Sequence, residues 1–173
     1  MKILLLATIS LAVMAGSAHA AATSNIAAGD AGVARGQIEL VIARFQAAII
    51  RKDKAGLSEL FLPANNSWIA VPTEATYRIV HARHPKARRF MPGSYAEFAS
   101  FISASPERME EKFSNVKIET DGAVASVYFD FVFLSNGEQQ NRGSETWQLI
   151  NTGSGWKINA LVYSINLDPA QVK

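Results

Sequence analysis

The stretch AVASVYFDFVFL, residues 123–134, decides how this chain folds. One face of it is apolar and largely aromatic, with Ala125, Val127, Phe129, Phe131 and Phe133. The alternating residues, such as Ser126 and Asp130, are mostly polar. A two-residue period with β-branched and aromatic side chains is typical of a strand that buries one face. The dipeptides Asp-Gly at 121–122 and Asn-Gly at 136–137 are hairpin signals on either side. We therefore predict a long strand in an antiparallel sheet.

The other elements follow outward from this strand. Similar patterns predict strands at 113–120, 143–150 and 155–165, and shorter ones at 66–72 and 75–80. Helical spacing predicts helices at 35–53 and 54–61, the second capped by Asp53. Ser94 and Glu97 form a capping box that begins a third helix, and Ser105 precedes a proline that can start one more helical turn. Helices followed by a run of strands indicate an α+β fold, with helices on one face of a curved antiparallel sheet.

The first 20 residues have the features of a cleavable signal peptide. Lys2 is followed by an apolar run from Ile3 to Ala15, and small residues occupy 18 and 20. The run is shorter than the 20 or so residues that span a bilayer, and no later stretch is long and apolar enough. We expect a periplasmic or secreted protein with a flexible leader at 21–34, one domain at 35–167 and a tail at 168–173.

Composition excludes several classes of function. There is no cysteine, so disulfides and thiolate metal sites are ruled out. Removal of Lys2 leaves 16 basic and 15 acidic residues, a formal charge of +1. A nucleic-acid-binding domain usually carries a larger positive excess. We expect no nucleic-acid partner and, once the signal peptide is gone, no membrane association.

Four segments together resemble the nuclear transport factor 2-like superfamily, particularly its SnoaL-like polyketide-cyclase and ketosteroid-isomerase branches. They are FQAAIIRKDKAGLSELF (45–61), FSNV with DGAVA (113–116 and 121–125), RGSETW (142–147) and GWKI (155–158). The resemblance covers about residues 37–166. It implies a cone-shaped, cystatin-like sheet wrapped around N-terminal helices, with a pocket at one end, and a homodimer formed through the sheet.

The catalytic residues of the steroid-isomerase branch are missing from the matching positions. Its helical tyrosine corresponds to Phe45, its general-base aspartate falls in the carboxylate-free segment 69–72, and its second acid falls at Thr146. Abstraction of a proton beside a carbonyl needs a base and an oxyanion donor. We therefore do not expect that reaction by those residues.

A basic stretch, HARHPKARRF at 81–90, is the most unusual local composition. Arginine side chains suit carboxylate or phosphate, which predicts an anion-binding rim at the mouth of the cone; a solvated connecting loop is the alternative. The rim residues are Arg78, Arg83, Lys86, Arg88 and Arg89. His81 and His84 have a spacing that metals can use, but catalytic zinc usually takes three protein ligands. We predict no metal site and no cofactor.

Carboxylates and aromatic residues are the remaining site candidates. The parity of the strand places Asp130 opposite the aromatic face, so we expect it to point outward. Glu145 could face a pocket, and Tyr163 or His81 could then act with it as an acid–base pair. An aromatic pocket is expected from Phe45, Trp68, Phe98, Phe129, Phe131 and Trp147, although such residues often only fill a core.

Three functions remain open. The first is an exported domain that binds a small apolar or anionic molecule in an aromatic pocket with a basic rim. The second is a cyclase, dehydratase or isomerase with a nonstandard acid–base pair. The third is a homodimeric protein-interaction module without a ligand. Because one fold hosts many functions, the resemblance alone does not choose among them.

Overall fold

The computed structural model describes the backbone of residues 19–63 and 66–167, and the side chains of residues 30–63 and 66–167. All but the last two residues of the predicted signal peptide lie outside the described residues, as does the whole of the predicted tail at 168–173. Within the described part of the chain, no helix is long and apolar enough to cross a membrane.

Two consecutive helices begin the fold. Helix α1 spans His19–Arg51, so the segment 21–34, which we expected to be a flexible leader, lies within it. Its buried stripe includes Ile38, Phe45 and Ile49. Helix α2 spans Lys54–Glu59, and the Asp53 side chain caps it by accepting a 2.8 Å hydrogen bond from the backbone N–H of Gly56. The predicted cap is thus confirmed.

The segment after α2 differs from the prediction. Strand β1 (Ser67–Pro72) is where we expected it, but residues 75–80 belong to helix α3 (Glu74–Arg83) and not to a second strand. The Thr73 side chain caps α3, and Glu74 pairs with Arg78 at 2.9 Å one helical turn later. These local interactions outweigh the strand preference of a short apolar run. The strand that pairs with the outer edge of β1 is the short β2 (Met91–Pro92).

Helix α4 (Tyr95–Ala104) begins with the predicted capping box. The Ser94 hydroxyl accepts from the Glu97 N–H at 3.2 Å and donates to the Glu97 carboxylate at 2.9 Å. The prediction of a helical turn after Ser105 is wrong. Ser105 ends α4, and strand β3 (Met109–Thr120) starts four residues before the predicted boundary.

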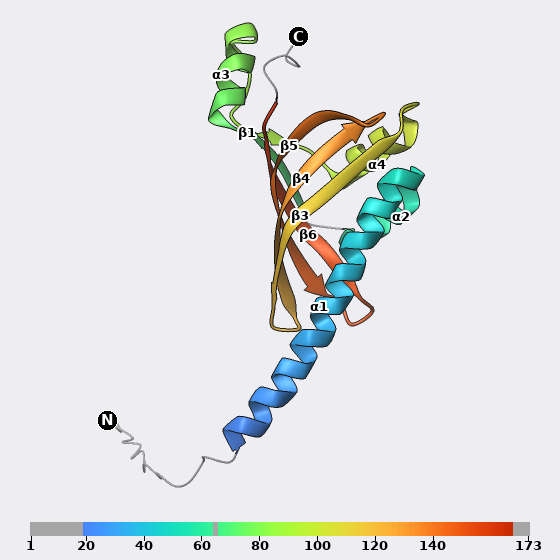
Figure 1. Cartoon of the computed structure of the whole chain (residues 1–173), viewed down its shortest axis with the longest axis vertical. Coiled ribbons are helices and arrows are strands. Elements are labelled where there is room, and N and C mark those ends of the chain that lie inside the picture. The colour runs from blue at the N-terminus through green and yellow to red at the C-terminus, as the bar shows by residue number, and fades with distance from the viewer. Residues whose placement is uncertain (1–18, 64–65, 168–173) are drawn as a thin grey trace, which may run out of the picture.

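Strands β4 (Val124–Ser135), β5 (Glu138–Asn151) and β6 (Trp156–Ile165) complete one six-stranded sheet in the order β2-β1-β6-β5-β4-β3. All neighbouring strands are antiparallel except β1 and β6, which are parallel. Figure 1 shows the sheet as curved and unclosed. The predicted α+β class is confirmed, with this one parallel pair as an addition to the expected antiparallel sheet.

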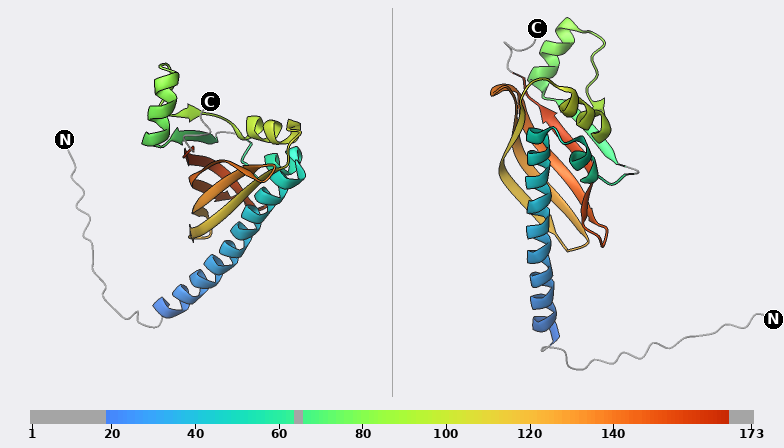
Figure 2. Two further views of the ribbon diagram at one scale, coloured as in Figure 1. Left: turned by 45° about the horizontal axis from the view of Figure 1, so that its top comes forward. Right: turned by 90° about the vertical axis from the view of Figure 1, so that its right-hand side faces the viewer.

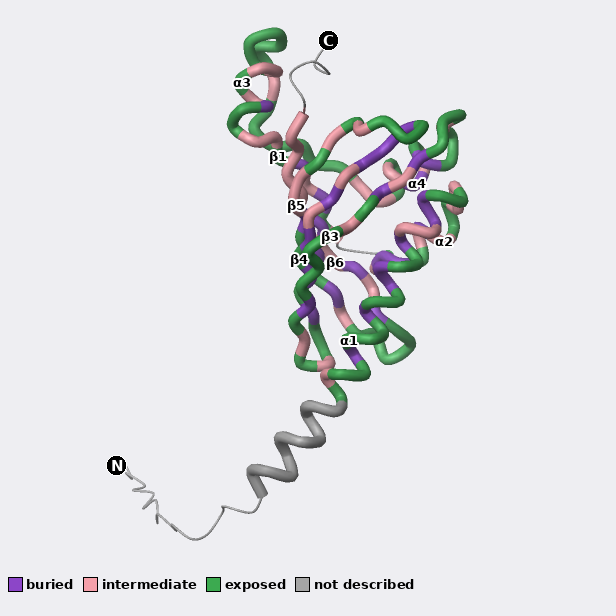
Figure 3. The backbone as a smooth tube through the Cα atoms, in the orientation of Figure 1, coloured by how far each residue is buried: buried purple, intermediate pink, exposed green. Residues whose placement is uncertain are grey.

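Three of the described helices cover one face of the sheet, and the fourth lies away from it (Figure 1). Figures 1 and 2 show α1, α2 and α4 against one face of the sheet, whereas α3 projects from the end of β1. Figure 3 shows the buried residues gathered where those three helices meet the sheet. The buried members of β4 are the five alternating residues of its aromatic face, together with Leu134 and Ser135 at its end. The sheet therefore has a concave side covered by helices and a convex side that carries no helix among the described residues.

Candidate functional site

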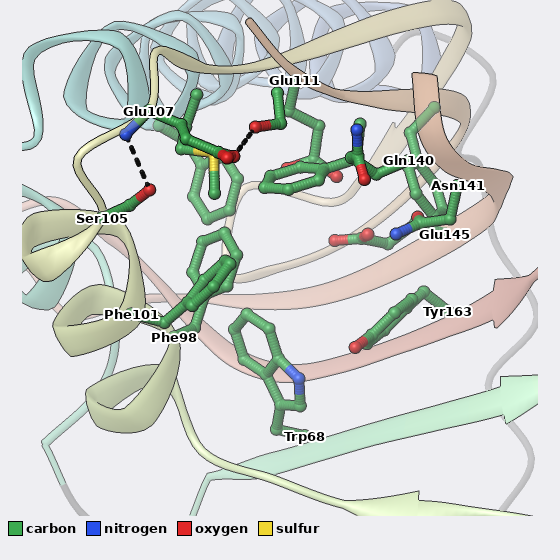
Figure 4. A pocket seen from close by; sticks show the side chains of 15 residues that line it. Trp68, Phe98, Phe101, Ser105, Glu107, Glu111, Gln140, Asn141, Glu145 and Tyr163 are labelled. Carbon is green, nitrogen blue, oxygen red and sulfur yellow. Dashed lines mark hydrogen bonds between the residues drawn. The ribbon is translucent and has the colours of Figure 1, made fainter. Parts of the chain in front are cut away.

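A cavity of about 410 Å³ lies on the concave side, between α4 and strands β3–β6 (Figure 4). It is lined by Phe45, Trp68, Phe98, Phe101, Ser105, Glu107, Met109, Glu111, Phe131, Phe133, Ser135, Gln140, Asn141, Glu145 and Tyr163. This volume is in the range that holds a small organic molecule. Aromatic and polar residues contribute equally to this lining, seven of each, and Met109 is the remaining residue.

The aromatic walls stand at angles to one another. The Trp68 ring lies 5.1 Å from Phe98 and 6.1 Å from Tyr163, and the second pair is nearly perpendicular. Tyr163 is also nearly perpendicular to Phe131, at 6.0 Å. Phe101, with 51% of its surface exposed, stands at the outer end beside Phe133. Ring faces thus border the hollow from several sides.

Glu145 lies on β5, in a row across the sheet between Phe129 of β4 and Tyr163 of β6. Only 4% of its surface is exposed, and its carboxylate accepts a hydrogen bond from the indole N–H of Trp147. Burial disfavours the charged form and raises the Glu145 pKa from 4.5 to about 8, against the opposing effect of the Trp147 hydrogen bond. At neutral pH this carboxyl is therefore largely protonated.

Glu111 is a second buried carboxyl, with 6% of its surface exposed. Burial, and then the negative charge of Glu145, raise its pKa well above the ordinary value. No described side chain donates a hydrogen bond to its carboxyl; the Gln46 side chain donates instead to its backbone oxygen, at 3.0 Å. Since every fully enclosed polar side-chain atom of the described residues has a partner, the Glu111 carboxyl oxygens open onto the cavity.

Sequence reasoning missed Glu111 because it predicted a helical turn after Ser105 and a strand only from residue 113. The available signal was the alternation of Met109, Glu111 and Phe113, which are spaced two apart and share one face of β3. That period places Glu111 with buried neighbours. A carboxyl at such a position is unusual enough to indicate a site.

Tyr163 and Trp68 place polar groups beside the two carboxyls. Figure 4 shows the Tyr163 hydroxyl, the Glu145 carboxyl and the Trp68 indole nitrogen directed toward the same hollow. Burial raises the Tyr163 pKa, interaction with Trp68 lowers it, and the charges of Glu145 and Glu111 raise it again. The hydroxyl therefore stays neutral over the physiological range and can donate a hydrogen bond.

The mouth of the cavity is polar. The Ser135 hydroxyl donates to the Glu107 carboxylate, and Gln140 and Asn141 stand on the adjoining end of β5. The described lining residues thus include three glutamates and no lysine, arginine or histidine. The electrostatic character of this cavity is acidic.

The structure divides the predicted aromatic set. Phe45, Trp68, Phe98 and Phe131 border the cavity. Phe129 and Trp147 lie behind it, fully buried, with their rings 5.1 Å apart and perpendicular. They are core residues, and Trp147 acts on the site through its hydrogen bond to Glu145.

The basic stretch does not form a rim for this cavity. None of the five predicted rim cations is among the lining residues, because α3 and the segment that follows it lie beyond the edge of the sheet (Figure 1). Arg78 and Arg89 pair with Glu74, and the Arg89 guanidinium lies 4.1 Å from the centre of the Tyr77 ring. Arg83, Lys86 and Arg88 are exposed.

The two histidines of the basic stretch lie outside the site. His81 is exposed on α3, where its ring lies 5.2 Å from Tyr77, so it cannot pair with Glu145. His84 ends that helix. No group of three potential metal ligands occurs among the described residues.

Asp130 points away from the cavity, in agreement with its strand parity. It accepts hydrogen bonds from Asn115 at 2.8 Å and from the Ser144 hydroxyl at 2.9 Å on the convex side. These bonds, helped by the charge of Lys117, lower its pKa. Asp130 is a surface carboxylate and not a partner for Glu145.

Solved structures share this fold. A nuclear transport factor 2-like protein with a cystatin-like fold from Novosphingobium aromaticivorans matches 88% of this chain and 92% of its own, with a TM-score of 0.58 and 15% identity. A proposed scytalone dehydratase from the same organism matches 78% and 85%, with a TM-score of 0.58 and 11% identity. A proposed dehydratase of the nuclear transport factor 2-like family from Streptomyces avermitilis matches 77% and 96%, with a TM-score of 0.54 and 22% identity.

These similarities establish that the chain has the nuclear transport factor 2-like, cystatin-like fold that the sequence resemblance implied. No family model and no curated protein matches the sequence. Identity at this level carries the fold and not the activity. Function must therefore be argued from the cavity.

Proposed function

We propose that this protein is an exported domain that binds a small, largely apolar molecule in the cavity between α4 and the sheet. The observation that carries the proposal is the pairing of an aromatic hollow with two buried carboxyls, Glu111 and Glu145. Burial of a carboxyl without full compensation costs folding free energy, so two such groups bordering one hollow indicate a functional role. Ligand sites commonly combine apolar walls with a few placed polar groups.

Of the two kinds of ligand expected, an apolar molecule fits the aromatic walls. An anionic molecule does not fit, because the cations that suggested it lie away from the cavity and the lining is acidic. A carboxylate or phosphate entering this hollow would meet Glu111 and Glu145 without a compensating positive charge.

A thermal-shift screen of small aromatic and alicyclic compounds tests the proposal. A ligand that binds only the folded state stabilises it by RT ln(1 + [L]/Kd), where [L] is the free ligand concentration, and so raises the melting temperature. We expect hits whose effect is lost in Phe131→Trp, which fills the hollow, and kept in Tyr128→Trp, a change on the convex face. A screen without hits, or hits that survive Phe131→Trp, would contradict binding in this cavity.

An acid–base enzyme is the second candidate, and the convergence of Glu145, Glu111 and the Tyr163 hydroxyl favours it. A carboxyl with a pKa of about 8 is partly ionised near neutral pH and can remove a proton. A neutral tyrosine or a protonated carboxyl beside it can stabilise a developing oxyanion.

Hydrogen exchange in D₂O tests this second function. Cyclic ketones found by the screen should lose the hydrogens next to their carbonyl group, as followed by proton NMR. The exchange should fall at least about 100-fold in Glu145→Gln and should be unchanged in Asp130→Asn. Exchange that does not depend on Glu145 would exclude it as the base.

The N-terminal sequence supports export, although residues 1–18 lie outside the described part of the chain. Expression of the full chain in a Gram-negative bacterium should give a periplasmic protein that begins at Ala21. Ala20→Phe should block processing, because signal peptidase needs a small residue there. An unprocessed cytoplasmic protein in the parent chain would refute the assignment.

A further inference from the structure

The charges around the cavity indicate which class of small molecule it accepts. We infer that the ligand is an organic monocation, an amine or quaternary ammonium joined to an apolar group, held by ring faces and by the Glu111–Glu145 pair. This inference rests on the proposed binding function. It names the chemical class of the ligand, which the fold and its relatives do not.

The first support is the unpartnered carboxyl of Glu111. It is 94% buried, since only 6% of its surface is exposed, and no described side chain donates to it. A carboxyl in this position gains from a ligand group that is positive or that donates hydrogen bonds. An ammonium group supplies both.

The second support is the absence of any competing cation. From the elements packed around Glu145, the titratable groups that face the hollow are Glu111 of β3, Glu107 just before it and Tyr163 of β6. No lysine, arginine or histidine is among the described lining residues. The described lining therefore offers no positive group of its own to a carboxyl that ionises in this site.

The third support is the arrangement of rings. Trp68, Phe98, Phe131 and Tyr163 present faces and edges around one space, with the Trp68–Tyr163 and Phe131–Tyr163 planes at 80° and 73°. A cation over a ring face is attracted by the negative face of the ring, most strongly over tryptophan and where water is excluded. Rings set at such angles can contact an ammonium group from more than one side.

The two carboxyls also set the charge of the ligand. Ionisation of both would place two negative charges in a buried site, which their mutual repulsion opposes. A monocation compensates one carboxylate, while the other carboxyl keeps its proton and remains a hydrogen-bond donor. Binding of the cation should therefore release about one proton per site at pH 7.

Titration calorimetry with three probes that share a benzyl group tests the inference: benzyltrimethylammonium, benzyl alcohol and phenylacetate. We expect the cation to bind at least about tenfold more tightly than the alcohol, and phenylacetate to bind more weakly than both. The apparent affinity for the cation should rise about 20-fold from pH 6.5 to pH 8.5, because the ionised carboxyl becomes more populated. The heat should vary with the buffer's ionisation enthalpy as one released proton requires.

Variants separate the contributions. Glu145→Gln should abolish both the preference for the cation and most of the pH dependence, and Trp68→Leu should weaken the cation more than the alcohol. Glu110→Gln is the matched control, because it makes the same change one residue from Glu111, where the side chain pairs with Arg108 and Lys112. It should leave all three affinities unchanged.

The outcomes are distinct. Equal or tighter binding of benzyl alcohol or phenylacetate would overturn the cation inference and leave the binding function standing. If none of the three probes binds, both the inference and the proposed function fail. Should Glu145→Gln not fold, Glu111→Gln and the pH series on the unaltered protein still decide the question.

Discussion

Glu145 combines three features at the scale of one residue: a place on the inward face of β5, a hydrogen bond from Trp147, and a border on the cavity. Each has a separate origin. The strand's alternation turns the side chain inward, the spacing of two brings Trp147 onto the same face, and α4 leaves the hollow unfilled. The result is a carboxyl whose protonation state a ligand or a change of pH can alter.

The stability of the protein should fall as pH rises through this site. Glu145 binds its proton more tightly in the folded chain, with a pKa of about 8, than in the unfolded chain, where the value is about 4.3. The stability that this raised pKa contributes is fully present below the pKa of Glu145 in the unfolded chain. It is lost as pH rises through the pKa of about 8 in the folded chain. Urea denaturation should show a loss of about 3 kcal/mol between pH 5 and pH 8.

Glu145→Gln should reduce this slope and make the variant more stable than the parent chain at pH 8. Asp130→Asn is the control, because the pKa of Asp130 is lowered and its titration falls below this window. A parent protein whose stability is flat from pH 5 to pH 8 would mean that the Glu145 carboxyl does not have the raised pKa.

At the scale of elements, irregularities in the strands direct side chains into the site. β3 has a bulge between Ser114 and Lys117, where Asn115 adopts a left-handed conformation with φ of 53°. Before the bulge the odd-numbered Glu111 and Phe113 face inward, and after it the even-numbered Ile118 does. Without the extra residue, one part of the strand would turn its apolar side outward.

Gly143 permits a close backbone approach between β5 and β6, two residues before Glu145. A Cβ added there would lie 2.0 Å from the backbone oxygen of Ser164. Gly143→Ala should therefore destabilise the fold by about 2 kcal/mol or more, because the strands must separate. Gly36→Ala, in open space on α1, should instead stabilise it by up to about 1 kcal/mol. Chemical denaturation of both variants checks the pair, and equal effects would contradict the steric explanation.

Ser94 secures the helix that forms one wall of the cavity. Ser94→Ala removes the cap of α4 and should lower the unfolding free energy by about 1 kcal/mol. Ligand affinity should fall with it, because Phe98 and Phe101 are carried by this helix. Ser103→Ala, on the exposed side of the same helix, should change neither quantity by more than about 0.5 kcal/mol. Unchanged stability in Ser94→Ala would show that tertiary contacts alone hold α4.

The whole molecule has two different faces. The helices and the cavity occupy the concave side, and on the convex side Tyr128, Thr146 and Val162 form a neighbouring row across β4, β5 and β6. Tyr128 and Val162 are each 40% exposed. Aromatic and aliphatic residues on an open sheet face are common in interfaces.

We propose that two copies pair through this convex face, and sedimentation over a range of concentrations should then show a dimer. Tyr128→Glu should shift the protein to monomer, because a charge would be buried in the interface. Leu40→Glu, an exposed position on α1, should leave the dimer intact. A monomer at every concentration in the parent chain would rule out the pairing.

Much of the fold could be predicted because it depends on local periodicity. The alternation in 123–134, the cap at Asp53 and the capping box at Ser94 each act within a few residues, and the structure contains all three. Short segments were predicted less well. Residues 75–80 carry strand-forming side chains, yet the Thr73 cap and the Glu74–Arg78 pair make them helical.

The amino-acid sequence by itself determined the α+β class, the inward face of β4, the outward position of Asp130 and the absence of cysteine chemistry. Only the tertiary structure decided that Glu111 and Glu145 open into one hollow, that Phe129 and Trp147 lie behind it, and that the basic stretch lies elsewhere. The physical reason is range. Periodicity, caps and turns are set by neighbours in the chain, whereas burial, pKa and charge compensation depend on side chains that folding brings together from distant strands and helices.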